Sequence, residues 1–455
     1  MLTTLLLIAL LPSVDDFDGL RGAVVALGDI DEDGVPDLAL AHRPRPFGLI
    51  DEPTENWPQV QQEPVVWLIS GADGSVLHGL RGPAGFGTEL AVLGDLDGDG
   101  AAELAVGDGG RGGDEGAGGV VTIVSSRTGT ELTRIQAPAG VRAFGRSLAG
   151  GGQLTGDPTP DFVIGAHGGA FIFDGARLEP TWILEPRAGC RVDRRAAEGA
   201  SLPSFPASER PVWPDDLSSG WGRGTYAGMN VAVVCDLDGD GLGEVALSTP
   251  REPACETNEP ALLDFGQRDS RTRIVFSRGE REPLSLEAAG WCVVSGEDLD
   301  GDGIPDLVTT TVNNHTRAWS GATGELIWEV DYTGGYLHAE GTSLALTRDH
   351  DGDGVRDLAV GENETFLDAD AGGLAVLSGR TGAILKRHRT TVTSQPGPPG
   401  QMVGGADVAV LADLDGDGLE AIAIWEPVPQ RLLLLNGADL QILWQLDVTS
   451  LGRPE

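Results

Sequence analysis

The sequence predicts an all-β fold: a seven-bladed β-propeller of four-stranded blades, with calcium-binding loops between strands 1 and 2. Three observations predict it: an acidic nine-residue loop recurs along the chain, short apolar runs flank each copy, and a second glycine-containing turn follows. The 455 residues include 68 glycines and only 5% aromatic residues. That composition favours tight turns and short strands over long helices.

Seven copies of the acidic loop define seven repeats. Five are strong: "DIDEDGVPD" (29–37), "DLDGDGAAE" (95–103), "DLDGDGLGE" (236–244), "DLDGDGIPD" (298–306) and "DHDGDGVRD" (349–357). "DLDGDGLEA" (413–421) is a near copy and "QLTGDPTPD" (153–161) a decayed one.

Each repeat reads as four short strands separated by turns, which is the pattern of a propeller blade. In the second repeat, "TELAVLG" precedes the loop and "LAVG" follows it, and turns such as "SGATG" (320–324) come before a last apolar run. A β-solenoid is the main rival, but its rungs are shorter. The propeller is expected over 20–449, with blades at about 20–82, 83–140, 141–187, 226–288, 289–333, 336–390 and 402–449, and an inter-blade insertion at 188–225.

Calcium is the predicted partner of the acidic loops. Alternate residues of such a turn point to its concave side, so positions 1, 3 and 5 converge, and glycine at position 6 permits the sharp reversal. Position 7 offers a carbonyl and position 9 a further carboxylate. Oxygen-only ligands in a flexible loop favour Ca²⁺. An EF-hand is excluded because position 12 is apolar or Thr and lies in a predicted strand.

The predicted metal ligands are Asp29, Asp31, Asp33, Val35, Asp37; Asp95, Asp97, Asp99, Ala101, Glu103; Asp236, Asp238, Asp240, Leu242, Glu244; Asp298, Asp300, Asp302, Ile304, Asp306; Asp349, Asp351, Asp353, Val355, Asp357; and Asp413, Asp415, Asp417, Leu419. Loop 413–421 is doubtful because Ala421 stands at position 9 with Glu420 one residue early. Loop 153–161 has only two acids and Pro158 at position 6, so five to six ions are expected. The alternative, solvated turns without metal, would suit a single copy better than six.

The net charge of −39 excludes binding to nucleic acid through phosphates. Residues 1–14 contain the apolar run "LTTLLLIALL" and read as a signal peptide, with a buried first strand as the alternative. We therefore expect an exported protein: extracellular, cell-surface or periplasmic. No segment is long enough to cross a bilayer as a helix. Cys190 and Cys255 lie in long loops and could pair, whereas Cys235 and Cys292 fall in apolar strands as buried thiols.

The repeats resemble the FG-GAP repeats of the integrin α-subunit propeller. "GFGTEL" (85–90) and "AFGRSL" (143–148) match the FG element, "VIGAH" (163–167) matches the GAP element, and the acidic loops match the family's calcium loop. The resemblance implies a protein-interaction or adhesion module that engages its ligand on the face opposite the calcium loops. This chain has more strong calcium loops than an integrin propeller carries.

A protein or polysaccharide ligand is expected on that face, and a monomeric protein. Candidate contact residues, in two long loops, are Trp57, Arg191, Arg194, Arg195, Trp213 and Trp221. A disordered insertion is the alternative for 188–225. The chain is predicted not to be an enzyme, because its seven histidines are scattered and no nucleophile motif stands out.

The alternative function is that of a propeller enzyme, either a quinoprotein-like dehydrogenase or a polysaccharide-acting hydrolase or lyase. "SGATGELIW" (320–328) resembles the tryptophan-docking turn of quinoprotein propellers. Trp182, Trp328 and Trp444 occupy matching places in three repeats, where tryptophans would pack between blades.

Overall fold

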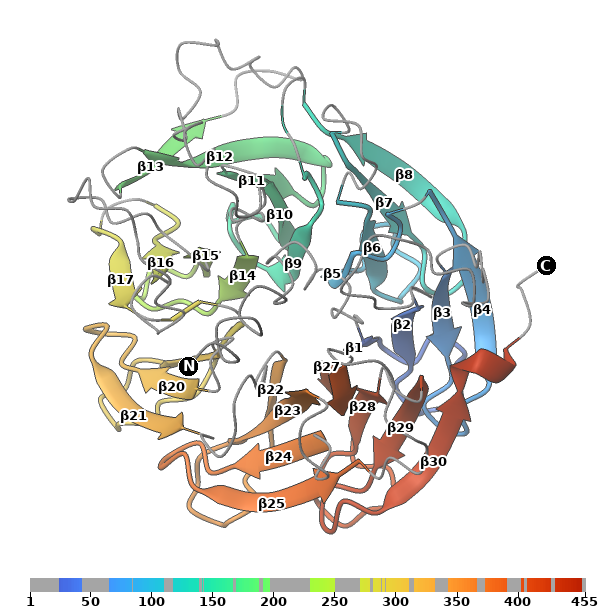
Figure 1. Cartoon of the computed structure of the whole chain (residues 1–455). Coiled ribbons are helices and arrows are strands. Elements are labelled where there is room, and N and C mark those ends of the chain that lie inside the picture. Colours follow the sequence, from blue (N-terminus) through green and yellow to red (C-terminus); the bar gives the residue numbers. More distant parts are fainter. Residues whose placement is uncertain are drawn as a thin grey trace, which may run out of the picture.

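The computed structural model describes residues 24–42, 65–109, 118–196, 230–249, 271–310, 315–331, 343–365, 373–390, 402–426 and 430–451, apart from short gaps at 84, 139–140, 142, 167–168, 188–190, 279–280, 288, 291 and 405–406. The described residues form seven antiparallel sheets arranged in a ring (Figure 1). This confirms the predicted all-β, seven-bladed propeller. No helix in these ranges is long and apolar enough to span a membrane.

Each blade is a meander in which consecutive strands pair. The first three comprise β1 (Val24–Ala26), β2 (Leu38–His42), β3 (Val65–Ile69), β4 (Val76–Arg81); β5 (Glu89–Gly94), β6 (Glu103–Gly107), β7 (Val120–Val124), β8 (Glu131–Gln136); and β9 (Ser147–Gly152), β10 (Asp161–Ala166), β11 (Gly169–Asp174), β12 (Glu179–Arg187), β13 (Arg191–Ala196).

The remaining four comprise β14 (Asn230–Val234), β15 (Glu244–Thr249), β16 (Arg271–Val275), β17 (Leu284–Glu287); β18 (Val293–Ser295), β19 (Leu307–Thr310), β20 (His315–Trp319), β21 (Leu326–Asp331); β22 (Leu344–Thr347), β23 (Asp357–Thr365), β24 (Gly373–Leu377), β25 (Ile384–Arg389), with β26 (Met402–Gly404); and β27 (Asp407–Val410), β28 (Ile422–Glu426), β29 (Arg431–Leu435), β30 (Ile442–Asp447). A 3-10 turn, η2 (Val448–Ser450), follows.

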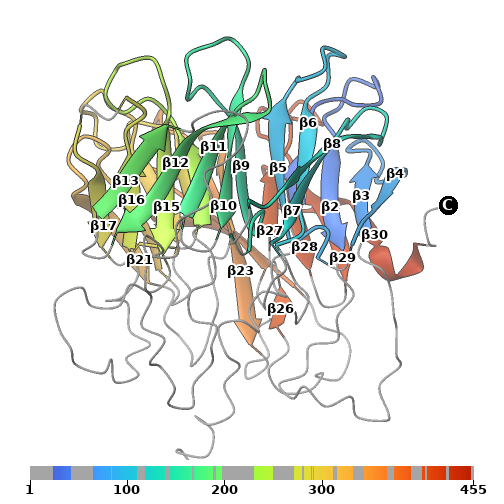
Figure 2. The same ribbon diagram turned by 90° about the horizontal axis from the view of Figure 1, so that it is seen from above.

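Two sheets have one strand more than the repeat predicts. β13 pairs with β12 along the outer edge of the third blade, so this blade extends to 196 and the insertion expected from 188 contains a strand. β26 pairs with the long strand β23 of the sixth blade, although 402–404 was assigned to the seventh. Figure 2 shows β23 and β26 extending beyond the other strands on one face of the ring.

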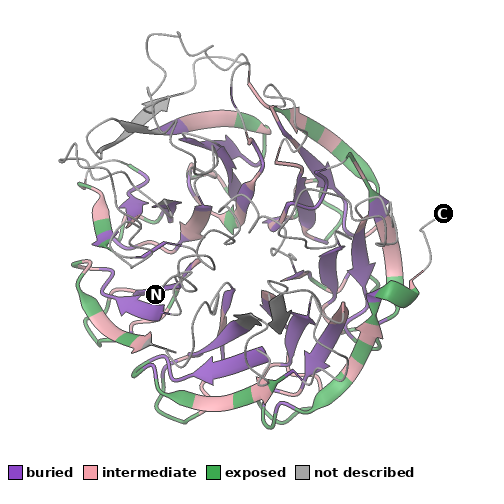
Figure 3. Ribbon diagram, viewed as in Figure 1, coloured by how far each residue is buried: buried purple, intermediate pink, exposed green. Residues whose placement is uncertain are grey.

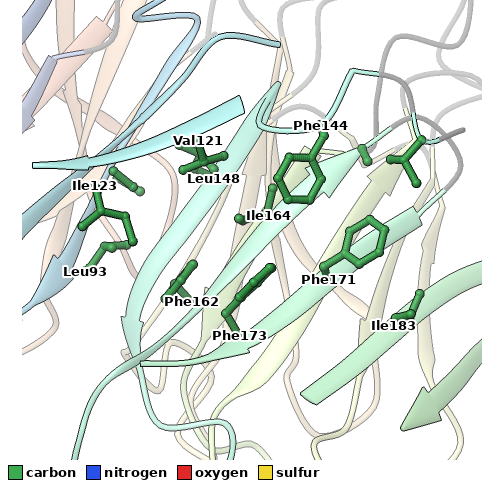
Figure 4. Close-up of a cluster of buried hydrophobic side chains, with 14 residues drawn as sticks. Leu93, Val121, Ile123, Phe144, Leu148, Phe162, Ile164, Phe171, Phe173 and Ile183 are labelled. Atoms are coloured by element: carbon green, nitrogen blue, oxygen red, sulfur yellow. The ribbon is translucent and has the colours of Figure 1, made fainter. Parts of the chain in front are cut away.

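The core consists of seven apolar clusters, each shared by two neighbouring blades. Second and third strands are almost fully buried, whereas outer strands such as β8 alternate between exposed and half-buried residues (Figure 3). The cluster between blades two and three includes two aromatic pairs contributed by the third blade: Phe162 stacks on Phe173 with ring centroids 5.1 Å apart, and Phe144 meets Phe171 edge-on at 5.5 Å (Figure 4). Because every cluster is shared by two blades, burial of apolar side chains holds neighbouring sheets together.

Side chains on the outer strands reach the turn of the following blade. The indole N–H of Trp328 donates to the carbonyl of Gly379, 2.8 Å away, and Lys386 Nζ donates to the carbonyl of Gly437 at 3.1 Å. His78 contacts the carbonyl of Arg127 in the same way. These residues occupy matching places in their repeats, so the tryptophans join blades, as the sequence suggests.

The ring closes between the seventh and first blades without exchange of a strand, because each sheet is built from one continuous stretch of chain. The indole N–H of Trp444 donates to the carbonyl of Gly71 (2.9 Å), and the backbone N–H of Val24 donates to Asp407 (2.6 Å). An apolar cluster that includes Trp67 and Trp425 fills the joint. Among the described residues, contacts of the Asp407 and Trp444 side chains with backbone groups, together with apolar packing, therefore close the ring.

Replacing Trp444 with Phe should lower the melting temperature more than the matched change Trp328→Phe. Both variants keep an aromatic ring and lose one hydrogen bond, a loss of about 1 kcal/mol. Only the 7–1 joint lacks a covalent connection between consecutive blades, so damage there can open the ring. Equal shifts of the two variants in thermal melts would contradict a special role for this joint.

Asp407→Asn should stabilise the protein increasingly as pH rises from 5 to 8. Burial, with a contribution from nearby Glu89, raises the pKa of Asp407 to about 7 despite hydrogen bonds from Val24 and Ser343. The folded state thus binds the proton more tightly than the unfolded state, and the parent loses stability as pH rises between about 4 and 7. Asn keeps an acceptor for Val24 without the charge. Chemical denaturation of parent and variant at each pH measures the difference in their free energies of unfolding. A difference that does not change with pH would refute a raised pKa of Asp407 in the folded state.

Candidate calcium loops

The acidic loops join the first and second strands of their blades. The carboxylate at position 1 organises the backbone: in loop 349–357, Asp349 accepts hydrogen bonds from the N–H groups of Gly352 (2.6 Å) and Gly354 (2.8 Å). Asp353 accepts one from Val355 (2.8 Å). The N–H of Gly354 is the main cause that lowers the pKa of Asp349. Part of each loop's geometry is therefore built from its own acids and amides.

Two loop positions adopt a left-handed backbone conformation, which favours glycine. Position 6 has a positive φ in all six DxDxDG-type loops, for example 86° at Gly354, as the sequence predicts. Position 4 is also left-handed: Gly352 has a φ of 80°, and Glu32 takes this conformation in loop 29–37 with a φ of 65°. In the sequence, position 4 is the first glycine of the recurring DGDG pattern. Glu32 forms an ion pair with Arg127 of the second blade.

The predicted ligands at positions 1, 3 and 5 come together in four of these loops, and in loop 236–244 positions 1, 3 and 9 do. Carboxylate oxygens lie within 4.8 Å of one another in the groups Asp29, Asp31, Asp33; Asp95, Asp97, Asp99, Glu103; Asp236, Asp238, Glu244; Asp298, Asp300, Asp302; and Asp349, Asp351, Asp353. Residues at position 7, such as Val35 and Ile304, donate their backbone N–H to the acid at position 5. Such all-oxygen groups have the donor chemistry that Ca²⁺ prefers.

Glu103 and Glu244 provide the test of whether a cation fits. Both side chains are fully buried, yet Oε1 of each has no hydrogen-bond partner. Burial, reinforced by neighbouring aspartates, raises the pKa of each to about 7. A buried carboxylate oxygen without a donor is costly, and a cation held with the adjacent aspartates would remove that cost. These two loops therefore fit a bound calcium ion.

The acid at position 9 has a second role that sequence reasoning missed. Asp306 accepts hydrogen bonds from the N–H groups of Leu299 (2.7 Å) in its loop and Gly321 (2.9 Å) in the turn between strands three and four. Asp37 links Ile30 to Gly71, and Asp357 links His350 to Gly379, in the same way. The acid thus ties the acidic loop to the second turn of its blade, which places both on one face.

Loop 153–161, the decayed copy, keeps the buried acid at position 9. Asp161 is fully buried and accepts hydrogen bonds from Leu154 and Thr155 (both 2.7 Å) and from Gly175 (3.1 Å). Loop 153–161 has therefore lost most of its predicted ligands while retaining the contact that holds the blade together.

Loop 413–421 differs from the acidic-loop pattern in another way. Ala421 removes the ninth acid, and Glu420 accepts a hydrogen bond from the N–H of Arg348 (2.9 Å) in the sixth blade. The amide of Asn436 donates to Asp417 (3.0 Å) and to Asp415. Protein donors thus satisfy part of this ligand set.

The other predicted site residues are placed as follows. Arg191, Arg194 and Arg195 belong to β13, opposite Arg187, Leu184 and Ile183 of β12, rather than to a loop. Trp57, Trp213, Trp221, Cys190, Cys255 and residues 1–14 lie outside the described residues. Cys235 and Cys292 are partly buried, and Cys235 Sγ lies 3.1 Å from Ser295 Oγ.

No known family profile matches the chain. Mouse integrin alpha-X is 34% identical over 173 residues, 36% of this chain and 14% of the relative. Mouse integrin alpha-M is 33% identical over 127 residues, 26% of this chain and 11% of the relative. Xenopus laevis integrin alpha-4 is 29% identical over 233 residues, 49% of this chain and 22% of the relative. The matches thus span less than a quarter of these relatives, and together with the fold they support an integrin-like FG-GAP propeller.

Among solved structures, a Bacillus licheniformis rhamnogalacturonan lyase superposes with a TM-score of 0.44 at 16% identity, covering 93% of this chain and 73% of that chain. An exotype rhamnogalacturonan lyase gives a TM-score of 0.44 at 17% identity, covering 93% and 65%. Likenesses this distant do not bear on activity.

Asp306→Asn should destabilise the protein even in excess chelator, by about 1–3 kcal/mol, because an amide cannot accept from both Leu299 and Gly321. The matched change Asp302→Asn keeps an acceptor for the N–H of Ile304 and removes only charge. It should lower the melting temperature in calcium and leave it unchanged in chelator. The structural role of Asp306 is wrong if both variants melt like the parent in chelator.

Proposed function

We propose that this integrin-like propeller is an exported, non-enzymatic binding module whose blades are stabilised by calcium. The observation on which this chiefly depends is the buried, unpartnered oxygen of Glu103 and of Glu244, each beside a group of aspartates. The recurrence of such groups in other blades extends the proposal to five or six ions. When bound, calcium would supply positive charge among carboxylates that otherwise repel one another.

The size of the stabilisation by calcium follows from the linkage between ion binding and folding. A site with a Kd of about 0.1 mM in about 2 mM calcium stabilises the folded state by about 1.8 kcal/mol. Five or six such sites give on the order of 10 kcal/mol, comparable to the whole stability of a domain. Export suits this requirement because external media supply millimolar calcium, and the apolar run at residues 2–11 and the integrin α relatives support it.

We propose that the ligand, a protein or a polysaccharide, binds the face opposite the calcium loops. The acidic loops and the strand 3–4 turns occupy one face, held together by the position-9 acids. On the opposite face, strands β23 and β26 project beyond the other strands. Arg191, Arg194 and Arg195 belong to the outer edge strand β13 of the third blade and stay candidate contact residues.

Removing calcium should lower the melting temperature of the protein by more than 10 °C, because several sites lose their stabilisation together. Melting in 2 mM calcium and in excess chelator, with elemental analysis of bound ions, provides the measurement. Magnesium at the same concentration is the control and should restore little. An unchanged melt with no bound metal would refute calcium stabilisation, and cleavage of pectic polysaccharides by the calcium-loaded protein would refute a non-enzymatic role.

A further inference from the structure

We propose that the loops ending in glutamate, 95–103 and 236–244, bind calcium more tightly than the loops ending in aspartate and fill first. The ninth residue of each loop would then set its affinity. This inference depends on the proposed calcium binding, and concerns how the sites differ from one another.

In the second blade, one carboxylate oxygen of Glu103 accepts a hydrogen bond and the other does not. Oε2 accepts the backbone N–H of Leu96, at position 2 of the same loop. Oε1 is buried without a donor, and the Glu103 carboxylate lies within 4.8 Å of oxygens from Asp95, Asp97 and Asp99. Four carboxylates therefore converge, and one of them has a buried oxygen that no described protein donor satisfies.

In the fourth blade, Glu244 has the same arrangement reached through a different contact. Its Oε2 accepts the N–H of Ser277 in the strand 3–4 turn, at 2.7 Å. Oε1 is buried without a donor, and the carboxylate groups with Asp236 and Asp238. Two independent blades thus show the same free oxygen wherever position 9 is glutamate.

The aspartate loops have no such oxygen. Both carboxylate oxygens of Asp37, of Asp306 and of Asp357 accept backbone N–H groups, one from the loop and one from the turn. Only the acids at positions 1, 3 and 5 gather in these loops. The shorter side chain stays between the two backbone segments, whereas glutamate is longer by one methylene and keeps an oxygen for the ion.

Contacts with arginine would not predict the same order of calcium affinities. Arg278 lies 3.3 Å from Asp240 in a glutamate loop, and Arg380 lies 3.2 Å from Asp353 in an aspartate loop. If arginine competition set affinity, these two loops would behave alike. If the ninth residue sets the affinity, loop 236–244 binds calcium more tightly than loop 349–357, because calcium affinity rises with the number of charged ligands.

Calcium titration of the full chain, followed by native mass spectrometry and calorimetry, tests the inference. We expect two ions to bind with a Kd at least about tenfold lower than the others. Glu103→Asp and Glu244→Asp should each convert one tight site into a weak one, and the double variant should have none. Glu131→Asp is the matched control, since Glu131 is exposed on β8 in an ion pair with Arg134, and it should retain both tight sites.

A single affinity class for all ions, or two tight ions in the double variant, would overturn the inference while leaving calcium binding intact. Binding of no calcium at any concentration would overturn both. Melting in chelator checks that each variant is folded, because a glutamate-to-aspartate change that still melts like the parent has altered only the ion site.

Discussion

In four of the seven blades, a buried aspartate at position 9 (Asp37, Asp161, Asp306 or Asp357) is the interaction on which the end of the blade depends. It accepts hydrogen bonds from an acidic loop and from the turn between strands three and four, as Asp306 does with Leu299 and Gly321. Glycine of that turn sits against the backbone of the loop's eighth residue, so close that a Cβ on Gly321 would lie 2.0 Å from the carbonyl oxygen of Pro305. Any side chain there would separate the two segments. The acid, the glycine and the loop therefore form one unit at the end of the blade.

This unit connects the blades as well as the strands. The turn that the acid holds is the same turn whose carbonyl accepts from the outer strand of the preceding blade, as Gly379 does from Trp328. A blade whose loop is well ordered thus presents a fixed acceptor to its neighbour. Calcium held in the loop would reinforce the joint between blades without contacting it.

The loops differ in how far they depend on a cation. Loop 153–161 keeps Asp161 and little else, and loop 413–421 draws on Asn436 and on the sixth blade. Loops 95–103 and 236–244 leave a buried oxygen without a donor. The repeats of one propeller thus range from turns whose acids are paired with protein donors to loops that leave a buried carboxylate oxygen without one.

The sequence by itself determined the number of blades, the place of each acidic loop and the convergence of positions 1, 3 and 5, because these follow from local periodicity and from turn chemistry. Only the tertiary structure decided which acids accept backbone N–H groups with both carboxylate oxygens and which leave a buried oxygen without a donor. Asp357 meets Gly379 across 22 residues, and Asp407 meets Val24 across 383. Such contacts depend on sheet register and on closure of the ring, which no short pattern encodes. The same holds for β13 and β26, whose pairing reflects the free edges of their sheets rather than the repeat.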